Sequence, residues 1–207
     1  QSSNVGTVTI GLKLGSTRFD EWVHRFGFSK PTGIDLPGEE AGIVPTRDEY
    51  SGSSIGNLPI GQGLSVTPIQ MAYGYEAIAN GGVAHTPHVI MGDDATAHRI
   101  MSAQNAHKVA RMLEGVLQAG GTASEAAIPG YTLAGKTGTA QKAENGGYSD
   151  TDFVASFIGF APSRNPRLLV SVMVDEPRGS IYGGEVAAPA FEKIASFALP
   201  YLKIPPQ

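Results

Sequence analysis

Strand-like segments joined by short connections limit what the second half of this chain can fold into. The segments cover Tyr131–Gln141, Phe153–Ala161 and Leu168–Asp175, and all are rich in β-branched and aromatic residues. The turn at residues 163–166 separates the second from the third, and so short a connection favours an antiparallel pair. In the third segment valines alternate with serine and methionine, so both faces are mostly apolar and we expect both to be covered. The sequence therefore predicts an antiparallel sheet.

Helical spacing of apolar residues precedes and follows these segments. Helices are expected at residues 16–27, capped by Ser16 or Thr17, after the capping box at residues 67–70, after Ser102 as far as the glycines at 120 and 121, and at residues 191–198. The stretch from 27 to 63 is rich in Gly, Pro and Ser, and we expect a long irregular segment of the kind that often lies over a functional site. Helices, then a sheet, then a helix that packs on it make an α+β arrangement.

Composition excludes several classes of function. Apolar residues make up 41% of the 207 residues and charged residues 16%, which is typical of a folded domain and not of a disordered chain. The net charge of −4 gives no polycationic surface, so we expect no nucleic acid partner. The absence of cysteine excludes disulfides and thiol catalysis, and no apolar run is long enough to span a membrane. The chain starts at Gln1, and we expect that a preceding segment has been removed.

The strongest chemical motif is Lys136-Thr137-Gly138-Thr139, which falls inside the first strand-like segment. Glycine weakens a strand, and close approach of a ligand to the backbone is one reason to keep it there. The ammonium group attracts an anion, threonine hydroxyls can bind a carboxylate, and a backbone N–H can face a developing oxyanion. The alternative is an edge strand that a lysine protects from aggregation, with ordinary threonines beside it.

A second motif, Ser2-Ser3-Asn4, stands at the start of the chain. A hydroxyl and a carboxamide two residues apart can point into one cleft, where the asparagine offers both a donor and an acceptor to an amide substrate. Taken alone, such a motif is more typical of a plain helix cap or turn than of a substrate-binding site.

Together the motifs resemble those of the penicillin-binding proteins, which carry S-x-x-K, S-x-N and K-T-G. The stretch Gly61–Ala72 is similar to the segment between the last two motifs in that family. Tyr182–Phe191 resembles the C-terminal segment of its class B members, the division and elongation enzymes. The resemblance implies a β-lactamase/transpeptidase-like fold, an antiparallel sheet flanked by helices, with residues 1–207 forming a single, partial domain.

The resemblance implies a role for each motif residue in a serine D,D-transpeptidase. Ser2 would belong to the proton-relay network, Asn4 would hold the amide of the acyl-donor peptide, and Lys136 would support charge and proton transfer. These three would be the catalytic residues of this chain. The reaction would be acyl transfer through a serine ester in two steps, with no metal or other cofactor.

The remaining motif residues would bind substrate. Thr137 and Thr139 would hold the terminal carboxylate of a D-Ala-D-Ala stem peptide or of a β-lactam. The Thr139 N–H would supply half of the oxyanion hole, and Gly138 would let the substrate lie along the strand. The family also implies an extracytoplasmic location, with an N-terminal membrane anchor.

The nucleophile motif is missing from these residues, since no serine is followed by lysine three positions later. The family places that serine upstream of S-x-N, so we expect this chain alone to be inactive and to need the upstream segment as a partner. That segment should add strands to the sheet, and without it an apolar sheet edge would be exposed.

Other activities remain open on the sequence. A β-lactamase would need a deacylating carboxylate in a pattern such as E-x-x-L-N, which does not occur here. A D,D-carboxypeptidase of the same fold shares these motifs, although the class B-like tail argues against it. A non-catalytic sensor of β-lactams or muropeptides is the alternative from another class. His85 and His88 suggest no metal site, because no third ligand accompanies them.

Overall fold

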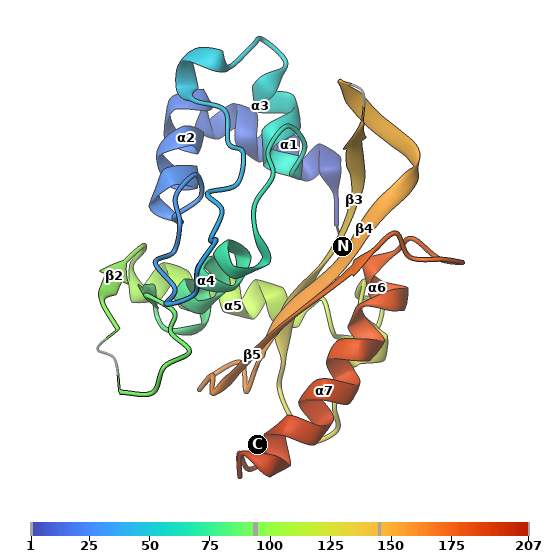
Figure 1. Ribbon diagram of the computed structural model, residues 1–207. Helices are drawn as coiled ribbons and strands as arrows, with labels where there is room; N and C mark the ends of the chain where they lie inside the picture. The colour runs from blue at the N-terminus through green and yellow to red at the C-terminus, as the bar shows by residue number, and fades with distance from the viewer. Residues whose placement is uncertain (1, 93–94, 145, 207) are drawn as a thin grey trace. The chain divides into compact units, whose positions relative to one another are not determined.

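The computed structural model describes residues 2–92, 95–144 and 146–206, which form two compact units (Figure 1). Of the described residues, the sheet unit contains 78–82, 101–144 and 146–206, and the helical unit contains 2–77, 83–92 and 95–100. Among the described residues, no helix has both the length and the apolar character needed to cross a membrane.

An antiparallel sheet organises the sheet unit, as predicted. Its strands are β3 (Ala134–Glu144), β4 (Gly147–Ala161) and β5 (Leu168–Asp175), in the order β3-β4-β5. The β3–β4 hairpin is longer than expected, because pairing continues past a register shift after Gln141 to the pair Glu144 and Gly147. The residues before Ala134, which were expected to start the first strand, lie outside the sheet.

The core of the sheet unit lies between one face of the sheet and the C-terminal helix α7 (Ala188–Tyr201). Phe157 of β4 and Phe191 of α7 are almost completely buried, with ring centroids 4.8 Å apart in an edge-on arrangement. The valines of β5 pack against this cluster. The opposite face of β5 is not covered as we expected, because Ser171 is exposed and Met173 is 53% exposed. The apolar alternation therefore overestimated the burial of this strand.

Helices complete the sheet unit. They are α5 (Ala103–Glu114), the 3-10 helix η3 (Ser124–Ala126), α6 (Gly183–Val186) and α7, and Figure 1 shows α6 and α7 following one another along the sheet. Helix α5 follows Ser102 as predicted, and Ser102 is its N-cap, with its hydroxyl accepting from Asn105 N. The helix ends well before residue 120, because Val116 and Leu117 turn into the core.

The helical unit contains short helices and long connections. Its elements are α1 (Asn4–Leu14), α2 (Ser16–Arg25), η1 (Arg47–Glu49), α3 (Ser54–Asn57), η2 (Leu58–Ile60), most of α4 (Pro68–Ala79), β1 (Val83–His85) and β2 (Ala97–Arg99). The irregular stretch from 27 to 63 is thus largely confirmed. Ser16 is the first residue of α2 and Gly15 is its N-cap, so the predicted side-chain cap is wrong.

Helix α1 was not predicted, because its β-branched residues have low helix propensity. The hydroxyls of Thr7 and Thr9 bond back to carbonyls four residues earlier, at Ser3 and Val5. Gly11 is the buried residue of α1, and a Cβ there would collide with the ring of Pro59. Close packing against the segment that follows α3 therefore overrides local propensity.

The predicted capping box of α4 is confirmed and has a second role. Thr67 N donates to Gln70 Oε1 at 2.9 Å, and Gln70 N donates to Thr67 Oγ1 at 3.2 Å. The Gln70 amide also donates to the carbonyls of Lys30 and Ala41 at 2.8 and 2.9 Å. This side chain is 1% exposed, so one buried amide both caps the helix and anchors the irregular segment.

The carboxylates of Asp35 and Glu39 stabilise the irregular segment at residues 27–63 through hydrogen bonds. Asp35 accepts hydrogen bonds from the N–H groups of Ile90 and Val89, which lower its pKa. Burial alone would raise the pKa of Glu39, but bonds from the Thr32 hydroxyl and N–H outweigh it, so the pKa lies below its usual value. These ionised groups bind the loop to itself and to the turn at residues 89–90.

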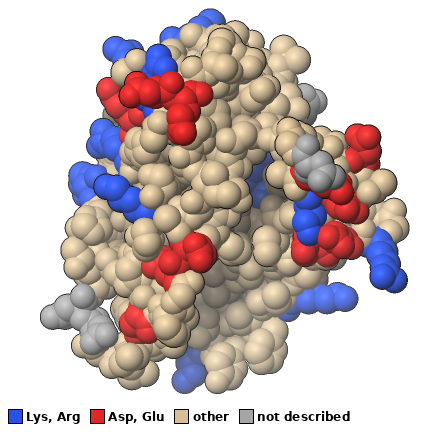
Figure 2. Space-filling view, turned by 45° about the horizontal axis from the view of Figure 1, so that its top comes forward, with Lys and Arg blue, Asp and Glu red and all other residues tan. Residues whose placement is uncertain are grey.

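On the face drawn in Figure 2, uncharged surface predominates and basic side chains stand beside acidic ones in small groups. His85 pairs with Glu76 at 2.7 Å. Among the described residues, no group of at least three histidines and carboxylates could hold a metal ion.

Lowering the pH should reduce the free energy of unfolding, because Asp35 becomes protonated and loses its charge. Its folded-state pKa lies below its unfolded value, so its contribution is complete above about pH 4 and is lost as the pH falls through the folded-state pKa. Urea unfolding from about pH 6 to about pH 2 should therefore show a smaller loss of stability in Asp35→Asn than in wild type, from a lower starting value. Glu40→Gln, an exposed neighbour, is the control and should follow wild type. Parallel curves for wild type and Asp35→Asn would contradict this.

Two phenylalanines of α7 give a matched test of the core. Phe191→Ala should lower the free energy of unfolding by about 3–5 kcal/mol, because it empties the site against Phe157. Phe197→Ala on the same helix should cost under about 1 kcal/mol, since Phe197 is 70% exposed. Urea denaturation of both variants measures the difference, and equal losses would refute the assignment of the core face.

Candidate functional site

The predicted substrate motif lies on β3, at one end of the strand order. Lys136 pairs with Ile158, Thr137 with Phe157 and Gly138 with Ser156. Paired residues share a face, so Thr137 lies on the face that packs on α7, whereas Lys136 and Gly138 lie on the other. Within the described residues, β3 has β4 as its only strand neighbour, so its outer edge is not covered by another strand.

Lys136 is partly buried and bends back along its own strand. Its Nζ donates to the Thr137 carbonyl at 2.8 Å and to Thr137 Oγ1 at 3.3 Å. Burial lowers the pKa of this ammonium group, because desolvation disfavours the charged form. A lysine with a lowered pKa is closer to the range in which it can exchange a proton near neutral pH.

The two threonine hydroxyls are held in place by neighbours. Thr137 Oγ1 lies 3.0 Å from the hydroxyl of Thr122, and Thr139 Oγ1 accepts from Gly183 N at 3.2 Å. A hydroxyl that accepts from a backbone N–H keeps its own O–H as a donor. Thr139 is thereby oriented to donate to an anion such as a carboxylate.

Glycines let the helix layer approach β3. A Cβ on Gly183, the first residue of α6, would meet the backbone oxygens of Ser156 and Gly138, and a Cβ on Gly184 would meet the Thr122 carbonyl. A Cβ on Gly138 would meet the Ser156 hydroxyl. Glycine is therefore required here by close packing rather than by a positive φ.

Ser2 and Asn4 lie together in the helical unit, at the start of α1. The middle residue of the motif, Ser3, is the N-cap, and its hydroxyl accepts from Gly6 N at 3.1 Å. The cap thus separates two exposed polar residues at the positive end of a helix. The four residues on β3 form one group and this pair forms another, each within its own unit.

Sequence reasoning missed Thr122 and the backbone of Gly183 as partners of the motif. Thr122 precedes the motif by more than ten residues, in a segment without regular structure, and no local pattern indicates it. The Gly183–Gly184 pair is a usable signal, because adjacent glycines at a helix start can indicate close backbone approach.

Comparison with known proteins identifies the family. Residues 1–196 match the penicillin binding protein transpeptidase domain. The chain is 40% identical to penicillin-binding protein PbpB of Mycobacterium tuberculosis over 99% of this chain and 33% of that protein. It is 35% identical to peptidoglycan D,D-transpeptidase FtsI of Buchnera aphidicola over 100% of this chain and 37% of that protein.

A solved structure agrees. Penicillin binding protein 3 of M. tuberculosis, complexed with ampicillin, superposes with a TM-score of 0.91 at 40% identity, over 100% of this chain and 50% of that one. The chain belongs to the penicillin-binding protein transpeptidase family and has its α+β fold in part. It spans about a third of the length of the relatives and half of the solved chain.

Gly183→Ala tests the close approach of α6 to β3. Its methyl group would meet two backbone oxygens that cannot move independently, so the free energy of unfolding should fall by about 1–3 kcal/mol. Gly147→Ala is the control, because the nearest atom to its Cβ is Glu144 O at 3.8 Å, and it should change stability by under about 0.5 kcal/mol. Urea denaturation measures both, and a neutral Gly183→Ala would show that the helix layer does not depend on this contact.

Proposed function

We propose that this chain is the substrate-binding part of a peptidoglycan D,D-transpeptidase, which cross-links stem peptides through a serine acyl-enzyme and binds β-lactams. The observation that carries the proposal is Lys136-Thr137-Gly138-Thr139 on an outer strand, in a chain that superposes in full on an ampicillin-bound relative. The partners are the D-Ala-D-Ala stem peptide, β-lactams and the upstream segment with the S-x-x-K serine. Residues 1–207 act as a single, partial transpeptidase domain.

The carboxylate of the substrate is the group that β3 is suited to bind. Thr139 offers an oriented O–H, and the Thr137 hydroxyl lies beside the Lys136 ammonium. Several charge-assisted donors converging on one carboxylate give both affinity and direction. Gly138 has no side chain between them, so an extended peptide can lie along the strand edge. The Thr139 N–H supplies half of the oxyanion hole.

Lys136, Ser2 and Asn4 carry the catalytic part of the proposal. The lowered pKa of Lys136 suits a group that supports proton transfer during acylation. Ser2 relays the proton through its hydroxyl, and Asn4 binds the amide of the acyl donor through its carboxamide. Their exposed positions on either side of Ser3, the N-cap of α1, support these roles, because both residues are accessible to a substrate.

The enzyme that contains this chain acts on the extracytoplasmic face of the bacterial membrane, held there by an N-terminal anchor. Its substrate is the peptidoglycan stem peptide, which lies outside the membrane. The chain alone is inactive, because none of its serines stands in an S-x-x-K motif.

Lys136→Met tests this assignment in the longer protein that carries the S-x-x-K serine. The second-order rate constant for labelling by a fluorescent penicillin should fall on the order of 100-fold or more, because a proton-transfer group is lost. The stability of the fold should hold or rise, since methionine avoids burying an ammonium group. Lys193→Met on α7, an exposed position, is the control and should label at the wild-type rate. Unchanged labelling of Lys136→Met would exclude its catalytic role.

A further inference from the structure

The segment that leaves β5 returns to the motif strand and is attached to it at both ends. We call residues 176–182 the strap. At its start Glu176 bonds to Lys142 of β3, and directly after its end Gly183 bonds to Thr139 of the same strand. The strap thus spans from the last part of β3 to the predicted carboxylate-binding hydroxyl.

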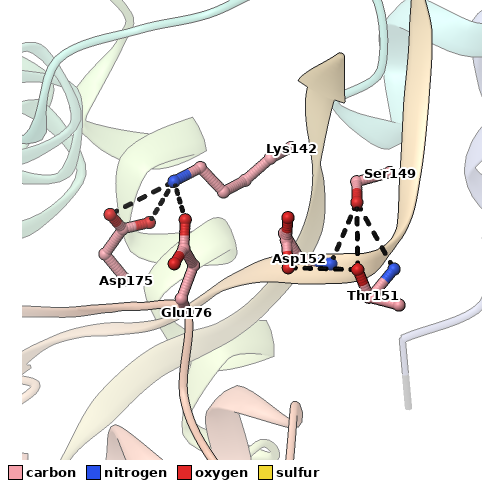
Figure 3. Close-up of polar contacts among 6 residues, drawn as sticks. All are labelled: Lys142, Ser149, Thr151, Asp152, Asp175 and Glu176. Carbon is pink, nitrogen blue, oxygen red and sulfur yellow. Dashed lines mark hydrogen bonds and ion pairs between the residues drawn. The ribbon is translucent and has the colours of Figure 1, made fainter.

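The first attachment is a network of charges. Lys142 Nζ lies 2.6 Å from Glu176 Oε1 and 3.1 Å from Asp175 Oδ1, and Figure 3 shows both carboxylates converging on the ammonium group. Hydrogen bonds to Glu176 and Asp175 raise the pKa of Lys142, so it stays charged at neutral pH. Asp175 pairs with Val154, which pairs with Ala140, so the contact reaches across β4 from one edge strand to the other.

The backbone conformation of Glu176 indicates that its side chain has a structural role. Its φ is +49°, a left-handed conformation that glycine or asparagine adopts at lower cost. Its N–H donates to Phe153 O at 2.9 Å, so the turn is fixed to the end of β4. The bond to Lys142 is a reason to have a carboxylate at a position where the backbone favours glycine.

Hydrogen bonds within the β3–β4 hairpin fix the position of Gln141, the residue before Lys142. Ser149 Oγ accepts from Asp152 N at 3.2 Å and from Thr151 N at 3.4 Å, as Figure 3 shows. The Gln141 amide donates to Ser149 O at 3.0 Å. The residue before Lys142 is therefore fixed to the opposite arm of the hairpin, and Lys142 can act as an anchor rather than as a mobile surface lysine.

The far end of the strap is ordered by its own contacts. Ser180 Oγ donates to Glu185 Oε2 at 2.6 Å and accepts from Tyr182 N at 3.3 Å. These bonds tie the end of the strap to α6, whose first residue, Gly183, orients Thr139. A displacement of the strap at Glu176 would therefore reach the Thr139 hydroxyl through this short segment.

We propose that Lys142 is a positioning residue for acyl transfer, which holds the strap so that Gly183 keeps the Thr139 hydroxyl directed at the substrate carboxylate. The inference rests on the proposed function for its chemical meaning. Lys142 does not itself bind the substrate carboxylate, because its charge is engaged by Asp175 and Glu176.

The structural part of this proposal, that Lys142 holds the strap in place, is tested on this chain by amide hydrogen exchange. Lys142→Met keeps the length and removes the charge, and it should speed exchange at Gly183 and Glu176 about two- to fivefold, the range expected for losing an exposed ion pair. The urea midpoint should stay near wild type. Lys142→Arg should restore wild-type exchange, and Lys193→Met should not alter it. Unchanged exchange in Lys142→Met, or equal changes in Lys193→Met, would overturn the inference.

The functional part of the proposal, that Lys142 supports acyl transfer, is tested on the longer protein with the S-x-x-K serine. Acylation by a carboxylate-bearing penicillin should slow about two- to fivefold in Lys142→Met and recover in Lys142→Arg. If wild type acylates and Lys142→Met acylates equally fast, the positioning role is wrong and the proposed function stands. If wild type is not acylated at all, the proposed function fails, and the positioning role fails with it.

Discussion

The burial of Phe157 against Phe191 is the contact on which the sheet unit depends. Side chains alternate along a strand, so once Phe157 faces α7, its neighbours Ser156 and Ile158 face away. The register then places Lys136 opposite Ile158, on the face away from α7. A slip of one residue would reverse these faces, so the core contact determines the face of the sheet from which the Lys136 side chain starts.

The same constraint explains why the start of α6, near the C-terminus, contacts the Lys136–Thr139 motif. Thr137 faces the helix layer because its partner is Phe157, and the hydroxyl finds Thr122 there. Thr139 faces the same way and finds the first N–H of α6. The glycines at 183 and 184 allow this approach, since any side chain would strike the backbone of the strands or of Thr122. The strand against which the helix layer packs is thus the same strand that carries the proposed carboxylate-binding threonines.

Much of this arrangement can be predicted from local chemistry. The antiparallel strands, the capping box at Thr67 and the helix that follows Ser102 are predicted by patterns within a few residues, and the structure confirms them. Helix α1 does not, because its stability comes from packing at Gly11 rather than from its β-branched sequence. The exposed face of β5 was misjudged for a related reason, since composition does not tell which apolar residues find a partner. The bond between Thr139 and Gly183 joins residues far apart in sequence, so no local pattern predicts it.

The most direct test of the central claim is peptide mapping by mass spectrometry of the longer protein after treatment with a β-lactam. A stable adduct should appear on the S-x-x-K peptide upstream of Ser2, and it should form on the order of 100-fold more slowly when Lys136 is replaced by methionine. The adduct should not appear on any peptide from residues 1–207, because these contain no S-x-x-K serine. An adduct on a serine or threonine of this chain, or no adduct in the longer protein, would contradict the account.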